Sequence, residues 1–165
     1  MSQSVKQTAP LTGAYRRAVI KDVDAMHQLI RNYADKDLML KRHANELYET
    51  IREYHVYEED GKVRGLCGLH IIWKDLAEIR SLAVEETMFG RDMGQTLVRL
   101  CLDEARELGI ARVFTLTYVP RFFEKLGFIV VDKSTLPHKI WGDCVRCHKF
   151  PDCDETGMIL DLNPA

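Results

Sequence analysis

The sequence has no long hydrophobic run and no strong excess of charge of either sign. Its 165 residues include 23 Lys and Arg against 25 Asp and Glu, which leaves a formal net charge of −2 at pH 7. No apolar run approaches the roughly 18 residues that a membrane-spanning helix needs. A balanced charge also lacks the basic excess typical of nucleic-acid-binding surfaces. We therefore expect neither a membrane segment nor a nucleic-acid partner.

The first dozen residues are polar and lack the apolar core of a secretion signal. We expect residues 1–13 to form a flexible N-terminal arm and residues 14–165 to form a single domain. A cytoplasmic location follows from the missing signal. The hydrophobic content of 46% is ordinary for a globular protein, so a domain of this length can bury a real core.

The five cysteines are an odd number, which argues against a framework of structural disulfides. Cys67 lies in an apolar stretch and Cys101 lies on the apolar face of a predicted helix. Both are most simply explained as small core residues.

The other three cysteines cluster near the C-terminus. Cys144 and Cys147 have the short spacing of a zinc half-site, Cys153 follows them, and His148 or Asp152 could complete four ligands. The usual second pair is missing, however. Three interpretations stay open: a zinc site, a reduced surface loop, and a redox pair of Cys144 and Cys147.

Hydrophobic periodicity and turn residues predict a mixed α/β domain. Asp60-Gly61 is a hairpin signal, and Asp22 is a candidate N-cap for the first helix. The second half holds a parallel strand–helix–strand unit, whereas the first half is antiparallel. The predicted strands are 14–19, 55–60, 62–73, 77–84, 111–118, 128–132 and 156–162, and the predicted helices are 23–33, 44–53, 93–108 and 120–126.

The segment from Ala77 to Gly109 carries the clearest functional signal. A strand (77–84) feeds a glycine-bearing loop (85–92), and the loop opens an amphipathic helix (93–108). Such a helix start presents several unpaired backbone N–H groups, and the helix dipole favours negative charge there. The segment therefore predicts an anion site suited to a phosphate-bearing ligand.

At this point the chain resembles the GNAT acyltransferase superfamily. The likeness rests on the strand order, Leu82-Ala83-Val84 at a strand end, the loop from Gly90 to Gly94, and FFEKLGF at 122–128. The ending, LPHKIW at 136–141 followed by the cysteine cluster, Asp154 and Glu155, resembles short stand-alone bacterial N-acetylglutamate synthases.

The resemblance implies a GNAT-like fold, with a mixed sheet of six or seven strands flanked by about four helices. It implies acetyl transfer from acetyl-CoA to an amino acid, with L-glutamate as the expected acceptor. Two other functions stay open: a GNAT enzyme for a different small amine, and a non-catalytic CoA-sensing module. Exposed strand ends at 128–132 and 156–162 also allow a homodimer.

In the superfamily, a loop of the pattern Arg/Gln-x-x-Gly-x-Gly/Ala binds the pyrophosphate of acetyl-CoA. Here the leading cation is replaced by Phe89 and the middle glycine by Asp92, a carboxylate that would repel the pyrophosphate. Asp92 could instead be a helix N-cap, and Arg91 could offset its charge. The resemblance gives these cofactor-binding candidates: Leu82, Ala83, Val84, Gly90, Arg91, Asp92, Met93, Gly94, Gln95 and Phe123.

Acetyl transfer needs a base for the amine and a proton for the leaving thiolate. Glu78, a charged residue in an otherwise apolar strand, is the candidate base; the alternative is an ion pair with Arg80 on the same strand face. The usual superfamily tyrosine is replaced by Phe123, which has no hydroxyl. Tyr118 is the candidate substitute, although it could simply pack at the sheet rim. CoA could also leave as the thiolate.

A glutamate acceptor brings two carboxylates, which arginine binds best. Arg80 and Lys139 are the leading substrate-binding candidates, and Arg17 is included with them. Lys41, Arg42 and Arg121 are weaker candidates, because cations at such positions are usually solvated.

Overall fold

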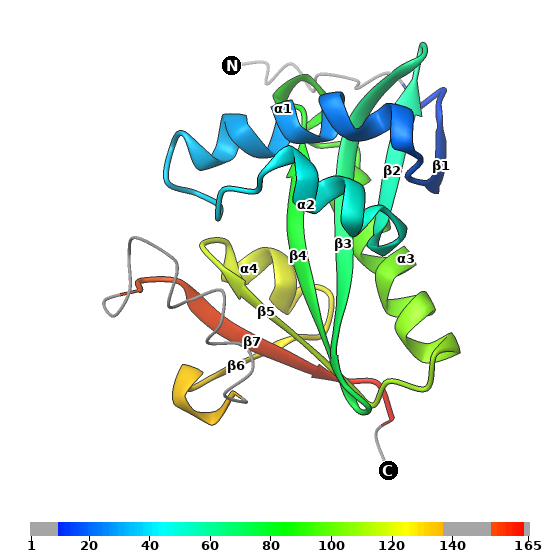
Figure 1. Cartoon of the computed structure of the whole chain (residues 1–165). Helices are drawn as coiled ribbons and strands as arrows, with labels where there is room; N and C mark the ends of the chain where they lie inside the picture. The colour runs from blue at the N-terminus through cyan, green and yellow to red at the C-terminus, as the bar shows by residue number, and fades with distance from the viewer. Residues whose placement is uncertain (1–9, 137–152, 164–165) are drawn as a thin grey trace, which may run out of the picture.

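A computed structural model describes residues 10–136 and 153–163 of the chain. In these ranges seven strands form one mixed sheet in the order β1-β2-β3-β4-β5-β7-β6 (Figure 1). This confirms the predicted mixed α/β class and the predicted order of strands along the chain. The strands are β1 (Ala14–Arg17), β2 (Tyr54–Glu59), β3 (Lys62–Trp73), β4 (Leu76–Val84), β5 (Arg112–Thr117), β6 (Ile129–Val131) and β7 (Thr156–Asp161).

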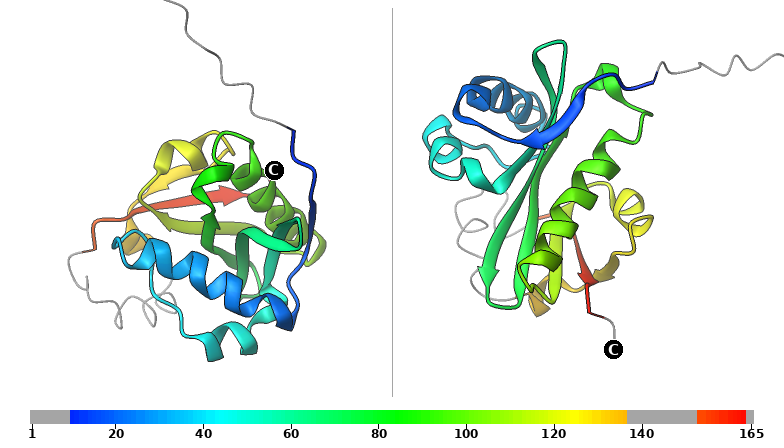
Figure 2. Two further views of the ribbon diagram at one scale, coloured as in Figure 1. Left: turned by 90° about the horizontal axis from the view of Figure 1, so that it is seen from above. Right: turned by 90° about the vertical axis from the view of Figure 1, so that its right-hand side faces the viewer.

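Helices cover both faces of the sheet. The helices α1 (Val23–Ala34) and α2 (Ala44–Glu49) lie on one face, and α3 (Met93–Glu107) and α4 (Pro120–Glu124) lie on the other (Figure 2). Short 3-10 turns precede β2 (η2, Ile51–Glu53) and α3 (η3, Glu86–Met88), and two more are η1 (Ile20–Asp22) and η4 (Lys133–Thr135). The predicted helix at 44–53 is therefore split into α2 and η2.

The β2–β3 hairpin forms as its turn residues predict. Asp60 and Gly61 have φ values of 53° and 71°, the left-handed conformation that a two-residue hairpin turn requires. The first strand ends at Arg17, two residues earlier than predicted, because the chain turns into η1. No helix in the described part of the chain is long and apolar enough to cross a membrane.

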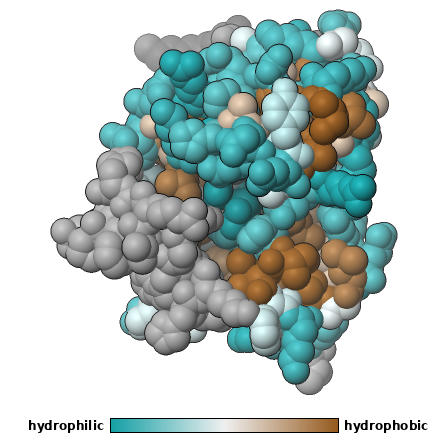
Figure 3. All heavy atoms as spheres, viewed as in Figure 1, coloured by the Kyte–Doolittle hydropathy of each residue, from teal (hydrophilic) through white to brown (hydrophobic). Residues whose placement is uncertain are grey.

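Alternation along the strands divides the core between the two faces. The larger cluster packs with α3 and includes Cys67, Leu69, Ala77 and Ile79. The residues that alternate with these on β3 and β4 therefore face the α1–α2 side. A third, smaller cluster around Phe114 lies on that same side, at the β5–β7 part of the sheet. Apolar side chains also gather on the surface of this face below α2 (Figure 3).

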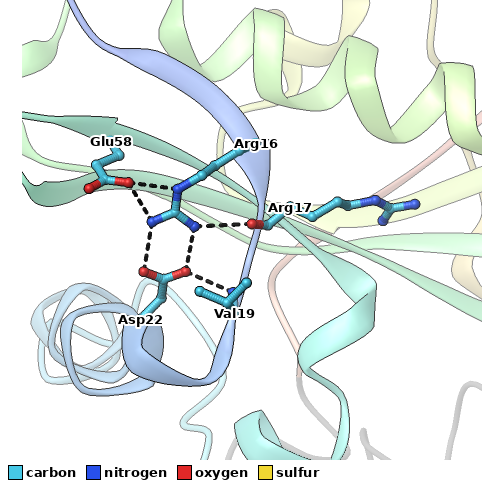
Figure 4. A network of polar contacts seen from close by, with 5 residues as sticks. All are labelled: Arg16, Arg17, Val19, Asp22 and Glu58. Carbon is cyan, nitrogen blue, oxygen red and sulfur yellow. Dashed lines mark hydrogen bonds and ion pairs between the residues drawn. The ribbon is translucent and has the colours of Figure 1, made fainter.

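A partly buried ion-pair network joins the first strand to the first helix (Figure 4). Arg16 donates to both carboxylate oxygens of Asp22 at 2.7 and 2.9 Å, and its Nε donates to Glu58 at 2.6 Å. Asp22 also accepts from the Val19 amide at 2.8 Å. Asp22 does stand at the N-cap position of α1, but its side chain makes no capping hydrogen bond there. The predicted cap is therefore wrong, because the carboxylate is committed to Arg16.

The end of the predicted N-terminal arm is attached to the sheet. The Thr12 amide and hydroxyl both donate to Glu59 at 3.0 Å, and the Gly13 amide donates to the Tyr57 hydroxyl at 2.8 Å. The rest of the predicted arm, up to residue 9, lies outside the described residues. So do residues 137–152, which include most of the LPHKIW segment.

Candidate active site

The strand β4 separates from its parallel neighbour part-way along its length. It pairs with β5 from Leu76 to Glu78, whereas β5 pairs with β7 over its whole length. Figure 1 shows β4 and β5 diverging from their shared end. Past Glu78, the edge of β4 that faces β5 therefore offers backbone groups that the β4–β5 ladder does not use.

A bulge interrupts β4 just past this point. Gly68 of β3 pairs with Arg80 and Leu66 pairs with Ala83, so two residues of β4 lie opposite one residue of β3. One of the two, Ser81, has a φ of 54°, a conformation that costs a non-glycine residue about 1–3 kcal/mol. Backbone strain of this kind clusters at functional sites, where the surrounding structure holds it in place.

Tyr54 holds the bulge from two strands away. Its ring lies over Gly68, where a Cβ atom would come within 2.8 Å of Tyr54 Cε1. Gly68 thus allows the ring to cross β3, and the Tyr54 hydroxyl hydrogen-bonds the Ser81 side chain. Burial raises the pKa of Tyr54, while Ser81, Arg42 and Arg80 lower it to a smaller extent. The neutral hydroxyl is therefore fixed against the bulge.

An ion pair lies beside the bulge on the α2 side of the sheet. Arg80 donates to Glu78 Oε2 at 2.8 Å, and their side chains are only 10% and 14% exposed. The predicted alternative for Glu78, a pair with Arg80, is therefore present. Arg42, from the segment before α2, is buried and acts electrostatically on the same Tyr54 as Arg80 does. Two guanidinium groups thus lie near Tyr54: that of Arg80, paired with Glu78, and that of Arg42, which is 3.6 Å from Glu46.

A second polar pair, formed by His70 and Glu53, lies next to Glu78. His70 lies directly opposite Glu78 in the β3–β4 ladder. Its Nδ1 lies 2.9 Å from Glu53 Oε1, at the end of η2. The site therefore contains two carboxylates, one imidazole and two guanidinium groups on one face of the sheet.

The glycine-bearing loop leads into α3 on the opposite face. The backbone of Asp92 is left-handed, with a φ of 58°, and its side chain makes no capping hydrogen bond to α3. The interpretation of Asp92 as a side-chain cap is therefore wrong, although it occupies the N-cap position. Leaving the first amides of α3 without an Asp92 cap keeps them open to a ligand.

Arg91 adds positive charge to this helix start. Its Nη1 contacts Met88 Sδ at 3.8 Å, and its Nε is buried with no hydrogen-bond partner among the described residues. Gly94 lies against the Phe122 ring of α4: a Cβ atom there would come within 3.3 Å of Phe122 Cζ. The loop and both helix starts thus form one continuous region. Met93 is buried, whereas Gln95 is partly exposed on the first turn of α3 and Phe89 is exposed.

Tyr118 makes a polar contact at the end of β5, whereas Phe123 lies in the hydrophobic core. Tyr118 follows the end of β5, and its hydroxyl donates to Asp154 Oδ1 at 2.7 Å. Phe123 is buried and packs edge-on against Phe122 and Phe128, at centroid distances of 5.0 and 5.3 Å. Its ring is thus part of the hydrophobic core, on the same face as α3.

The structure does not bring Arg17 to this site. Arg17 lies on β1, three strands from β4, and its guanidinium is paired with Glu104 of α3 at 2.8 Å. We therefore drop Arg17 as a substrate-binding candidate, because its charge is used on the α3 face. Lys41 and Arg121 are exposed, and Lys139 lies outside the described residues.

The cysteine loop provides no support for a metal site. Cys144 and Cys147 lie outside the described residues, and Cys153 is partly buried, with its carbonyl accepting from Lys133 at 2.6 Å. Among residues 10–136 and 153–163, no group of three or more His, Cys, Asp or Glu side chains could hold a metal ion. Cys67 and Cys101 are buried in the core, as predicted.

The model of the acetyltransferase (GNAT) family matches residues 20–128. The chain belongs to the GNAT family. Among its relatives, an uncharacterized N-acetyltransferase of Chlorobaculum tepidum is 37% identical over 147 residues, covering 89% of this chain and 95% of that protein. An amino-acid acetyltransferase of Mycobacterium tuberculosis is also 37% identical, covering 90% of this GNAT chain and 84% of that protein.

Solved structures agree with this membership. Rv2747 of M. tuberculosis, in complex with CoA and NLQ, is 33% identical, with a TM-score of 0.78 over 91% of this chain and 99% of that chain. N-acetylglutamate synthase of Neisseria gonorrhoeae, with coenzyme A and N-acetyl-glutamate, is 24% identical, with a TM-score of 0.84 over 95% of this chain and 37% of that chain. At that identity the second likeness shows the GNAT fold alone.

Sequence reasoning missed five residues of this site. Tyr54, Gly68, Ser81 and the His70–Glu53 pair come together only through the register of β2, β3 and β4. The signal available in the sequence was a histidine inside an apolar strand, opposite a strand that carries a glutamate. Arg42 was expected at the surface, because its segment has no periodicity that predicts burial.

Proposed function

We propose that this GNAT enzyme transfers the acetyl group of acetyl-CoA to the amino group of an amino acid, with L-glutamate as the acceptor. The observation that carries the proposal is the presence of two cations near Tyr54: Arg80, which pairs with Glu78, and the buried Arg42. Two guanidinium groups suit an acceptor with two carboxylates. The relative from M. tuberculosis that is named an amino-acid acetyltransferase supports the same reaction class.

The start of α3 is the proposed site for the pyrophosphate of CoA. The amides of Met93, Gly94 and Gln95 stand at the positive end of a 15-residue helix. Arg91 lies beside them with its Nε unpartnered among the described residues. The carboxylate of Asp92 works against this binding, so we expect an affinity below that of a loop with glycine at position 92.

The separated edge of β4 is the proposed site for the thioester. An acetyl carbonyl needs a backbone donor, and the segment from Ser81 to Val84 leaves the ladder that pairs β4 with β5. The Val84 carbonyl is already used, because it accepts from the Tyr33 hydroxyl at 2.6 Å. Tyr54, held over Gly68, keeps the Ser81 bulge in the conformation that presents its amides.

The proposed reaction begins when a carboxylate of the acceptor binds Arg80 in place of Glu78. At rest, Arg80 occupies Glu78 Oε2, so an acceptor carboxylate that binds Arg80 releases that oxygen to take the amine proton. The neutral amine nitrogen then attacks the thioester carbonyl carbon, and a C–N bond forms as the C–S bond breaks. The departing sulfur takes the proton of Tyr118, which follows the end of β5, and the second proton of the nitrogen passes to the Tyr118 oxygen and restores its hydroxyl.

The test is a thiol-release assay with acetyl-CoA and each common amino acid in turn. We expect L-glutamate to exceed the other acceptors in kcat/KM by at least about tenfold, equal to about 1.4 kcal/mol of transition-state binding. L-Glutamine is the matched control, since it lacks only the second carboxylate. Equal rates with both would refute the assignment of glutamate and leave amino-acid acetyl transfer intact.

Variants separate catalysis from binding. Glu78→Gln is expected to lower kcat by about a hundredfold or more while CoA affinity, measured by calorimetry, stays unchanged. Glu86→Gln is the control, because Glu86 is exposed and paired only with the exposed Lys36 at 2.9 Å. An unaltered kcat in Glu78→Gln would exclude Glu78 as the base.

A further inference from the structure

The pair of Glu53 and His70 has the geometry of an oriented imidazole. Glu53 Oε1 lies 2.9 Å from His70 Nδ1. A carboxylate can only accept, so Nδ1 carries the hydrogen and Nε2 holds the lone pair. Among the described residues, Nε2 has no hydrogen-bond partner. Nδ1 of His70 is thus used to orient the ring, and Nε2 is left able to take a proton.

The second oxygen of Glu53 strengthens this reading. Glu53 Oε2 is buried and has no hydrogen-bond partner among the described residues. A buried polar atom without a partner calls for an explanation in a native structure. Glu53 uses its carboxylate to orient His70: Oε1 makes the bond to Nδ1, and Oε2 has no competing donor among the described residues.

His70 stands next to the candidate base. It lies opposite Glu78 across the β3–β4 ladder, and the Cβ atoms of such cross-strand pairs are about 5 Å apart. The side chain of His70 is 32% exposed, against 14% for Glu78. The imidazole thus neighbours the Glu78 carboxylate in the sheet and is more exposed to solvent than that carboxylate, as a proton relay requires.

We propose that His70, oriented by Glu53, carries the proton of the acceptor amine from Glu78 to solvent. The N–H bond of the amine breaks as an O–H bond forms on Glu78. The proton then moves to His70 Nε2, which regenerates the Glu78 carboxylate, while the Nδ1 hydrogen stays on the bond to Glu53. The imidazolium finally gives its Nε2 proton to bulk water, and no other reactant is consumed.

This relay rests on the proposed function, because it assumes that Glu78 accepts the proton. It extends that function by assigning two positioning residues outside the strand that carries the base. His70 acts through Glu78, so its removal slows regeneration of the carboxylate and leaves acceptor binding in place. Among the described residues, Glu53 bonds the ring of His70 and Glu78 lies opposite it in the β3–β4 ladder.

The first experiment measures kcat and KM of full-length His70→Asn and His70→Ala. Asn can keep the bond to Glu53 but lacks the second nitrogen. We expect kcat to fall about tenfold in both, less than the hundredfold or more of a directly removed base, with KM within about twofold. Added imidazole should restore the rate of His70→Ala toward that of the wild type, and should not restore Glu78→Gln.

The matched control is His55→Ala. His55 is another histidine of the same sheet; it is buried, and its Nε2 lies 3.0 Å from Glu104 Oε2 on the α3 face. Its removal is expected to lower the melting temperature without any rescue of rate by imidazole. Equal rescue of His55→Ala and His70→Ala, or no rescue of His70→Ala, would overturn the relay.

A nitrogen-15 NMR spectrum of the histidine rings gives a readout that needs no acceptor. We expect the neutral ring of His70 to carry its hydrogen on Nδ1, and Glu53→Gln to weaken that preference. A hydrogen on Nε2 would leave no lone pair for the relay and would overturn it. If the wild type acetylates no amino acid, the proposed function fails, and the NMR spectrum still decides the orientation of His70.

Discussion

Asp92 should have two unfavourable effects at the start of α3. Its left-handed backbone should strain the helix start, and its carboxylate should oppose the pyrophosphate of CoA. Its φ of 58° lies in the left-handed region, and its side chain forms no capping bond that would compensate. Glycine adopts this conformation freely. Asp92→Gly therefore removes two unfavourable contributions, one from the backbone and one from the charge, and the two can be measured separately.

The backbone contribution predicts a more stable protein. A left-handed conformation costs an L-residue about 1 kcal/mol or more, and part of the gain is offset because glycine makes the unfolded chain more flexible. A net gain of about 1 kcal/mol corresponds to a rise of about 2–4 °C in melting temperature for a domain of this size. Thermal unfolding followed by circular dichroism measures this rise.

The charge contribution predicts tighter binding of CoA. Two unit charges about 6 Å apart in a water-like dielectric repel by about 0.7 kcal/mol, and by more where water is partly excluded. Asp92 is exposed, so the lower end applies. We expect CoA affinity to rise about threefold in Asp92→Gly, measured by calorimetry at low salt. The gain should shrink at about 0.5 M salt, because ions screen exposed charges.

Two further variants isolate the contributions. Asp92→Asn keeps a side chain that tolerates the left-handed region and removes only the charge, so affinity should rise without a change in melting temperature. Asp60→Gly relieves a φ of 53° in the β2–β3 turn, so stability should rise without a change in affinity. If CoA affinity stays the same or weakens in both Asp92 variants, the carboxylate does not oppose the pyrophosphate.

Three other variants test the supports of the site. Tyr54→Phe removes the hydrogen bond to Ser81, and we expect kcat to fall about tenfold, with a loss of about 1–2 kcal/mol in the free energy of unfolding. Asp22→Asn should cost about 2 kcal/mol at pH 7, measured by urea unfolding, because it breaks charged hydrogen bonds. Burial raises the pKa of Asp22, but the bonds from Arg16 and an amide outweigh it and lower the pKa overall. Its stabilisation is therefore complete above about pH 5 and is lost as pH falls through the lowered pKa. The free energy of unfolding of the variant should therefore fall less steeply with acidification than that of the wild type. Tyr118→Phe should lower kcat about a hundredfold at constant KM in the thiol-release assay, as expected for loss of a proton donor.

Two of these variants have a matched control. Tyr57→Phe removes another buried hydroxyl of β2 and should lower stability without slowing the reaction. Asp35→Asn removes an exposed ion pair with Arg31 and should change stability by less than about 0.5 kcal/mol. Equal kcat losses in Tyr54→Phe and Tyr57→Phe would contradict a specific role of the bulge. An unaltered turnover in Tyr118→Phe would show that CoA leaves as the thiolate.

Local sequence patterns predicted most of the fold. The apolar positions of α1 and α3 recur at helical spacing, and Asp60-Gly61 marked a tight hairpin, because these signals act over a few residues. The βαβ unit around α3 was predicted for the same reason. Element ends were less accurate: the predicted helix at 44–53 is interrupted at Thr50, where the chain turns into η2.

The sequence by itself determined the order of the elements and the anion-favouring start of α3. It also placed Glu78 and Arg80 on one face of a strand, where an ion pair was one of two interpretations. Only the tertiary structure decided that Tyr54 crosses Gly68 to reach Ser81, that His70 lies opposite Glu78, and that Arg42 is buried while Arg17 is used elsewhere. The physical reason is register. A one-residue shift or bulge between strands moves side chains to the other face, and that shift depends on packing across the whole sheet.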